Sequence, residues 1–305
     1  MDQQDLATLL AAGERAAFHG PPAAAVKALE SAVVLAQGQG RAAEMTAAAW
    51  LLGVALAANG RYGGALTVLA PLLDAAEARH APPEQRLFGA FAAATTASVQ
   101  RQIGRHSSAQ EYDGRGLALT DGSGEGAFDC TLGLAADAVG LGDSETAAAE
   151  LETAAALIPT RADEWWRQRV RLDWVRAEVA LLQDQPNVAA TAAAAAVERA
   201  ERSRAPRHVA KGLLFLGVSQ LNAGVDEAVA TLRRASTLAE GLGAVPLIWP
   251  ARALLGALLA EDEPAESDRS LAAARTAVLS IAGDLPPEVR AEWLARPDVV
   301  ALLGT

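Results

Sequence analysis

The side chains best suited to binding chemistry recur at helical spacing between residues 167 and 178. They are Arg167, Arg171, Trp174 and Glu178. Because neighbours in this set are three or four residues apart, a helix would place two guanidinium groups, an indole and a carboxylate on one stripe. Arginine and tryptophan often carry interface energy, and a guanidinium can hold a carboxylate through two hydrogen bonds. The stripe predicts an anchor for an acidic or C-terminal peptide; alternatively, Trp174 fills the core and the arginines form a solvated, salt-paired surface.

Catalytic chemistry has little support in the sequence. The chain has four scattered histidines, namely His19, His80, His106 and His208. They form no H-E-x-x-H motif and no cysteine–histidine pair, and no nucleophile elbow is present. The glycine-rich segment 121–126 lacks the glycine spacing of a dinucleotide site, and Leu132 stands where a calcium loop has its closing glutamate. We therefore predict no enzyme activity, no cofactor and no metal site, and we expect Cys130 to be a small buried apolar residue.

Composition and charge argue against several classes of partner. Hydrophobic residues make up 51% of the chain but aromatic residues only 4%, and much of the apolar content is alanine, the best helix former. A net charge of −11 argues against wrapping a phosphate backbone, so we expect no nucleic-acid partner. The first ten residues, MDQQDLATLL, carry no basic segment, and no apolar run approaches the length of about 20 residues that crosses a bilayer. We expect no membrane association and a cytoplasmic location.

The segment from Trp50 to Ala76 shows the kind of element that would position such side chains, namely two helices joined by a tight turn. Gly53 interrupts the apolar surface of the first helix. A glycine costs an isolated helix about 1 kcal/mol and is tolerated where another backbone must come close. The Asn59-Gly60 pair stops this helix, because both residues accept the left-handed conformation of a helix C-terminus. A second helix is predicted to begin near Arg61, with apolar residues at three- and four-residue spacing.

This pattern repeats along almost the whole chain. The small residue of the first helix recurs at positions 13, 53, 97, 135, 177, 217 and 256, so the period is near 40 residues. We predict a single solenoid of seven antiparallel helix pairs followed by a C-terminal capping helix. The predicted pairs span residues 2–38, 42–80, 86–120, 126–159, 162–204, 206–241 and 246–283, and the cap spans residues 284–305.

The spacing within these pairs resembles the tetratricopeptide repeat. A small residue lies about seven residues before a Gly or Asp turn, and Ala and Leu follow, as in G…GRYGGALTVL, A…GDSETAAAEL and G…GVDEAVATL. HEAT and armadillo repeats share the period but lack the Gly-to-Gly spacing. The resemblance implies an all-α fold, an alpha-alpha superhelix. The chain is also similar to the repeat arrays of bacterial regulatory ATPases and transcription activators, although it has no G-x-x-x-x-G-K-[ST] loop and no evident DNA-reading domain.

In a tetratricopeptide-like array, the first helix of each pair lines the concave face. Aligned through the small residue, the candidates for partner contact on this face are Trp50, Arg101, Gln102, Arg167, Arg171, Trp174, Glu178, Lys211 and Asn222. A basic patch that includes Arg202, Arg207 and His208 lies at the junction of the fifth and sixth pairs. Glu198 and Glu201 lie among its residues, so we expect a solvated surface of mixed charge there.

The leading hypothesis for function is a non-catalytic scaffold or adaptor in bacterial regulation, with a peptide or protein segment bound on the concave face. One alternative is a regulatory module that senses a small molecule or a signalling peptide. Another is a self-assembling repeat protein, because the exposed edge of a terminal helix pair can bind a second copy and form a homodimer. The sequence names neither the partner nor the pathway.

Overall fold

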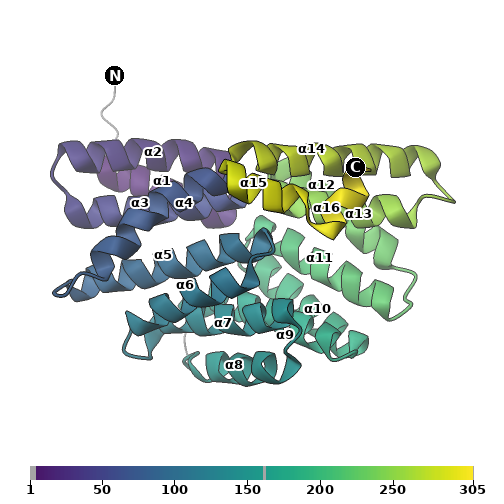
Figure 1. The fold of residues 1–305 in the computed structure, drawn as a ribbon, viewed down its shortest axis with the longest axis horizontal. Coiled ribbons are helices and arrows are strands. Elements are labelled where there is room, and N and C mark those ends of the chain that lie inside the picture. The colour runs from purple at the N-terminus through teal and green to yellow at the C-terminus, as the bar shows by residue number, and fades with distance from the viewer. Residues whose placement is uncertain (1–4, 161–162, 305) are drawn as a thin grey trace. The chain divides into compact units, whose positions relative to one another are not determined.

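A computed structural model describes residues 5–160 and 163–304 of the chain. These residues form sixteen α-helices and one short 3₁₀ helix, and the described ranges contain no β-strand (Figure 1). The prediction of an all-α fold built from helix pairs is confirmed. No helix in these ranges is both long enough and apolar enough to span a bilayer.

Contacts divide the chain into two compact units, Met1–Arg161 and Ala162–Thr305, which we call unit 1 and unit 2. Unit 1 contains eight α-helices: α1 (Leu6–His19), α2 (Pro22–Gly38), α3 (Ala42–Ala58), α4 (Tyr62–Ala76), α5 (Pro83–Gln102), α6 (His106–Ala118), α7 (Gly124–Leu141) and α8 (Ser144–Ala156). The assignment of the whole chain to one solenoid stays a prediction.

Unit 2 opens with the 3₁₀ helix η1 (Asp163–Trp165) and continues with three helix pairs and two short helices. These are α9 (Trp166–Leu182), α10 (Pro186–Arg202), α11 (Pro206–Asn222), α12 (Ala228–Leu242), α13 (Val245–Leu258), α14 (Pro264–Asp284), α15 (Pro287–Leu294) and α16 (Pro297–Leu303). Several of these helices begin with proline, whose missing N–H costs nothing in the first turn.

The odd-numbered helices of each unit contact one another in series, and we call them the inner helices. In unit 1, α1 contacts α3, α3 contacts α5, and α5 contacts α7. In unit 2, α9 contacts α11, and α11 contacts α13. The even-numbered helices pack mainly on the helices that flank them in sequence. Side chains on the free side of the odd-numbered helices are therefore gathered on the inner side of each unit.

The glycines of the first helices make room for a leucine of the second helix in the same pair. A Cβ atom on Gly53 would lie 2.5 Å from Leu69 Cδ2, and one on Gly217 would lie 2.7 Å from Leu232 Cγ. Leu69 and Leu232 are fully buried, so neither leucine has space to turn away. The predicted role of these glycines in close helix packing is confirmed at both positions.

Most turns between paired helices use a left-handed residue. Gly60, Gly104 and Gly142 have φ angles of 81°, 87° and 78°. The first pair differs: Gly20 is extended, with φ −138° and ψ −170°. It is followed by Pro21, and a residue before proline is confined to the extended region.

The end of unit 2 is covered by α15 and α16, in the segment predicted as a cap. Trp293 of α15 is fully buried, meets the Trp249 ring at 5.8 Å, and donates from Nε1 to the Val278 carbonyl at 3.3 Å. Arg290 Nε donates to the Ala282 carbonyl at 2.7 Å, near the C-terminus of α14. The buried Trp293 therefore covers the apolar end of the α13–α14 pair, and Arg290 caps a carbonyl group near the C-terminus of α14.

Candidate functional site

Helix α9 carries the predicted Arg–Trp stripe, and the structure separates its members by burial. Trp174 is 6% exposed and belongs to a core cluster with Val170 and Leu213. The flanking Arg167, Arg171 and Glu178 are half-buried. The alternative interpretation is therefore right for the indole, which fills the core, while the charged members of the stripe reach the surface of unit 2.

Helix α11 brings three further residues against this stripe. The His208 ring stacks on the Trp174 ring at 5.3 Å with an interplanar angle of 18°, and meets Trp166 edge-on at 5.1 Å. Lys211 Nζ lies 4.7 Å from the centroid of the Trp174 ring, within cation–π range. We call Arg167, Arg171, Trp174, Arg207, His208 and Lys211 the α9–α11 cluster.

Close approach of the helices makes this arrangement possible. A Cβ atom on Gly212 of α11 would lie 2.9 Å from Val197 Cγ2, 3.3 Å from the Val197 backbone nitrogen and 3.5 Å from Trp174 Nε1. Val197 belongs to α10 and is buried. Glycine at position 212 thus lets α11 approach both α10 and the Trp174 indole, with no side chain between them.

The electrostatic environment of the cluster is dominated by positive charge. Burial, the largest effect, and the charges of Arg167 and Arg171 together lower the pKa of Arg207 to about 10. Burial also places the pKa of His208 well below its ordinary value of 6.5, and Arg207, Arg167, Arg171 and Lys211 add to this shift. His208 is therefore a neutral imidazole at pH 7, surrounded by cations.

Three buried polar atoms of the cluster have no hydrogen-bond partner, namely Arg207 Nε, His208 Nδ1 and Trp174 Nε1. Leaving a buried donor or acceptor unpaired costs roughly 1–3 kcal/mol. Buried polar groups are normally satisfied, so an unpaired set in one place needs a physical explanation.

Lys211 is one of the predicted contact residues, whereas Arg207 and His208 belong to the patch that is predicted to be a solvated surface. A signal for Arg207 was present in the repeat itself. Arg207 and Lys211 lie ten and six residues before Gly217, just as Arg167 and Arg171 lie ten and six residues before Ala177. Two equivalent positions on the consecutive inner helices α9 and α11 are therefore occupied by cationic residues on both helices. Two helices are needed to assemble the group, and no single stripe reveals it.

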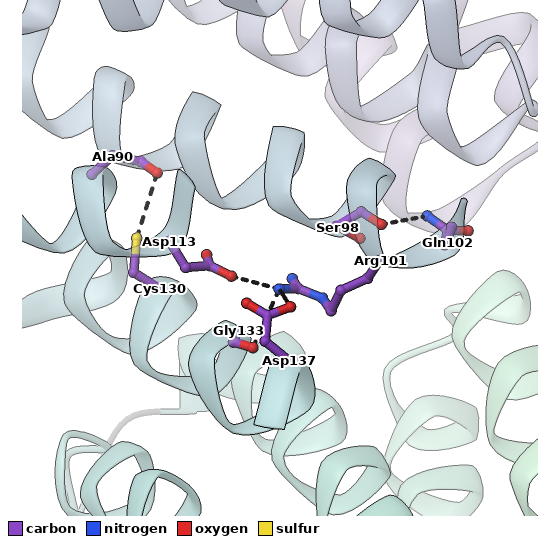
Figure 2. A network of polar contacts seen from close by, with 8 residues as sticks. All are labelled: Ala90, Ser98, Arg101, Gln102, Asp113, Cys130, Gly133 and Asp137. Atoms are coloured by element: carbon purple, nitrogen blue, oxygen red, sulfur yellow. Dashed lines mark hydrogen bonds and ion pairs between the residues drawn. The ribbon is translucent and has the colours of Figure 1, made fainter. Parts of the chain in front are cut away.

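In unit 1, the predicted contact residue Arg101 lies in an internal ion-pair network (Figure 2). Arg101 Nη1 on α5 donates to Asp113 Oδ2 of α6 at 2.5 Å, to Asp137 Oδ1 of α7 at 2.9 Å and to the Gly133 carbonyl at 3.2 Å. A Cβ atom on Gly133 would lie 2.1 Å from Asp113 Oδ2, so glycine gives the carboxylate its space. The network fastens three consecutive helices together.

Burial and pairing compete within this network. Burial would lower the pKa of Arg101, but the charges of Asp113 and Asp137 outweigh it and raise the pKa above its ordinary value. Burial raises the pKa of Asp137, although Arg101 acts in the opposite direction. Both aspartate side chains are fully buried and the Arg101 side chain is 14% exposed. We therefore assign Arg101 a structural role.

The remaining candidates, Gln102, Trp50 and Asn222, also have contacts within the chain. Gln102 Oε1 accepts from the Tyr62 hydroxyl at 2.9 Å. Trp50 stacks on Phe91 at 4.8 Å and donates to Thr95 Oγ1 at 3.3 Å. Asn222 is exposed and donates to the Val218 carbonyl at 2.8 Å. The structure brings none of these three into the α9–α11 cluster, so their role in binding stays a prediction.

Residues able to hold a metal ion do not form a group in the described ranges. No group of three or more His, Cys, Asp and Glu side chains with suitable geometry occurs there. Cys130 is buried and its Sγ lies 3.7 Å from the Ala90 carbonyl (Figure 2), so the prediction of a buried cysteine is confirmed.

The chain is similar to known proteins in its fold. No family model and no curated protein sequence matches the chain. Among solved structures, it is similar to the Rap conjugation gene regulator of the plasmid pLS20 in complex with the Phr* peptide. The sequences are 14% identical, the match covers 93% of this chain and 77% of that chain, and the TM-score is 0.69. The likeness supports a tetratricopeptide-like helical-repeat fold.

Proposed function

We propose that this protein is a non-catalytic regulatory scaffold that binds a peptide or protein segment on the inner helices of unit 2, mainly α9 and α11. The observation that carries the proposal is the α9–α11 cluster. It combines half-buried cations, large aromatic rings and buried polar atoms without partners on adjacent inner helices. Arginine and tryptophan in such a setting are the residue types that dominate interface energies.

The structural neighbour supports this proposal by analogy of fold. That protein is a regulator whose structure was solved with a peptide bound. A stack of helix pairs provides a long inner surface on which a chain segment can lie, because side chains from consecutive inner helices meet there. Function resides in the site rather than in the fold, so the α9–α11 cluster is the main evidence for peptide binding and the likeness of fold is secondary.

A displayed library of random peptides tests the proposal. We expect the full-length protein to enrich a defined set of peptides, and Arg171→Ala to weaken their binding by about tenfold or more, measured by fluorescence anisotropy. Arg202→Ala is the matched control, because Arg202 is an exposed arginine of α10 that pairs with Glu198 on its own helix. It should leave binding unchanged. Equal enrichment by the unmodified protein and by Arg171→Ala would refute this binding site.

A further inference from the structure

We propose that the α9–α11 cluster is a binding site for a single oxyanion group, a carboxylate or a phosphate, with Arg207 as its central donor. The inference rests on the proposed function, since it names the chemistry of the group that the bound segment would offer. It is supported by charge, by unsatisfied donors, by the start of helix α11 and by rigid packing.

The first support is the electrostatic environment of Arg207 and His208. Four cations, Arg167, Arg171, Arg207 and Lys211, lie around the imidazole of His208. Glu178 is the one acidic member of the α9 stripe. The charges that act on Arg207 come from Arg167 and Arg171, and both disfavour its protonated form. A negatively charged group placed beside Arg207 would favour its protonated form.

The second support is the set of buried polar atoms without partners. Arg207 Nε can only donate, and it has no acceptor in the described structure. His208 is 2% exposed, and its Nδ1 also has no partner. An oxyanion offers several lone pairs to the Arg207 donor, and hydrogen bonds between a guanidinium and an oxyanion are among the stronger ones in proteins.

The contrast with Arg101 shows how this fold satisfies a buried arginine from within. Arg101 has two aspartates and a backbone carbonyl around Nη1. Arg207 is half-buried, its buried Nε has no partner in the described ranges, and other cations lie near it. The anion that compensates Arg101 belongs to the chain itself, whereas we assign the anion that would pair with Arg207 Nε to a ligand.

The third support is the start of helix α11. Arg207 and His208 directly follow Pro206, the first residue of this 17-residue helix. The N-cap residue is Ala205, and no side chain caps the first turn. The free N–H groups and the positive end of the helix dipole therefore add to the attraction for an anion at this place.

The fourth support is rigidity. The His208 ring is fixed between Trp174 and Trp166, and Gly212 holds α11 close to α10 and Trp174. Because these groups are already ordered before a ligand arrives, binding loses little side-chain entropy.

Inorganic phosphate is the probe for the first experiment. At constant ionic strength, added phosphate should raise the thermal midpoint of the protein with the logarithm of its concentration, and calorimetry should give saturable binding with one site per chain. Arg207→Met should weaken phosphate binding by about tenfold or more. The same variant should be at least as stable as the unmodified protein without phosphate, because it removes an unpaired buried donor. Loss of a purely structural arginine would have the opposite effect.

Two further variants keep the experiment decisive. Lys211→Met changes a half-buried residue and should also weaken phosphate binding, even if Arg207→Met folds poorly. Arg202→Met is the control outside the cluster and should respond to phosphate as the unmodified protein does. If phosphate gives no saturable effect, or if both cluster variants respond like Arg202→Met, the inference is wrong.

A second part of the experiment distinguishes a peptide carboxylate from free phosphate as the source of the oxyanion. It also tests the oxyanion site and the proposed peptide binding independently. Acidic peptides with a free C-terminal carboxylate and their amidated, neutral counterparts are tested for competition with phosphate. Competition by the acidic peptides alone supports both proposals. Phosphate binding that no peptide displaces supports the oxyanion site and counts against peptide binding there. Peptide binding that is insensitive to phosphate and to Arg207→Met overturns the oxyanion site but leaves the scaffold function standing.

Discussion

Two arginines show how differently this chain treats the same side chain. Arg101 is neutralised by Asp113 and Asp137 on the next two helices, so its energetic role can be tested by breaking the pairs. Arg207 lies among cations, so its role is better tested by adding an anion. The local sequence around each arginine does not distinguish these two situations, because the acids that pair with Arg101 are 12 and 36 residues away.

At the residue scale, the first prediction concerns the Arg101 network. Arg101→Met should lower the free energy of unfolding at pH 7 by about 3–5 kcal/mol, because it leaves two buried carboxylates without their counter-ion. Asp137→Asn should cost at most about 1 kcal/mol, since the amide keeps an oxygen that accepts from Arg101 and removes one buried negative charge. Urea denaturation of both variants measures the difference. Losses of equal size would show that the two carboxylates are not sharing one guanidinium.

The difference in stability between Asp137→Asn and the unmodified protein should depend on pH, and the direction of the change follows from the pKa of Asp137. Burial raises the pKa of Asp137 above its ordinary value of 3.8. The folded chain therefore holds a proton that the unfolded chain has already released, so this contribution is full below pH 3.8 and is lost as the pH rises through the folded pKa. Relative to the unmodified protein, Asp137→Asn should gain stability as the pH rises from 4. A constant difference between the two proteins across this range would contradict the expectation.

The second prediction at this scale concerns His208. Its pKa is well below 6.5 in the folded protein because of burial and of Arg207 and Lys211 on α11 and Arg167 and Arg171 on α9. Below pH 6.5 the unfolded chain binds a proton that the folded chain does not. The contribution of neutral His208 to the free energy of unfolding is therefore full above pH 6.5. It is lost as the pH falls below 6.5, by up to about 1.4 kcal/mol per pH unit.

Comparison with His208→Gln isolates this effect. Urea midpoints at pH 8, 6 and 5 should fall more steeply for the unmodified protein than for the variant. Phosphate should reduce the difference, because a bound anion favours the protonated imidazole. Parallel curves for the two proteins would mean that His208 keeps an ordinary pKa.

At the element scale, the helix pairs are held by small residues that match a leucine across the pair. Gly53 with Leu69 and Gly217 with Leu232 repeat the same geometry in different units of the chain. The sequence revealed these positions because the small residue recurs at a period near 40 residues. Gly20 departs from the other turns and is extended, because the proline that follows it confines it to that region.

Substitution of two helical glycines by alanine should have opposite effects. Gly53→Ala should destabilise the protein by about 1–2 kcal/mol, because the added Cβ would overlap the buried Leu69 and overpacking outweighs the gain in helix propensity. Gly114→Ala is the control in α6, where an added Cβ meets nothing within 4 Å. It should stabilise the protein by about 0.5–1 kcal/mol. Thermal and urea unfolding measure both; stabilisation by Gly53→Ala would show that Leu69 yields easily.

At the scale of the whole molecule, a cationic cluster is embedded in an acidic chain. The net charge is −11, while four cations gather on α9 and α11. A small anion can contact the cluster alone, whereas a long polyanion would also extend over other parts of a chain whose net charge is negative, which disfavours its binding. The charge distribution thus favours a short ligand with a local negative group.

A competition experiment tests whether the protein prefers a short anionic ligand to a long polyanion. At about 0.15 M salt, a DNA duplex should displace less bound peptide than inorganic phosphate does at the same total phosphate concentration. Fluorescence anisotropy of a labelled acidic peptide measures the displacement. A duplex that competes more strongly than phosphate, with affinity that falls steeply as salt is raised, would indicate a nucleic-acid partner instead.

The sequence by itself determined the all-α fold, the pairing of helices and the positions of the small packing residues, because these depend on periodicity within one segment. It also placed Arg167, Arg171 and Lys211 on first helices. Only the tertiary structure decided that Trp174 is core, that Arg101 is paired with Asp113 and Asp137, and that Arg207 and His208 join the arginine stripe. The physical reason is that burial and charge pairing depend on which side chains of neighbouring helices meet. Such contacts join residues far apart in the chain, and no periodicity within a single helix contains them.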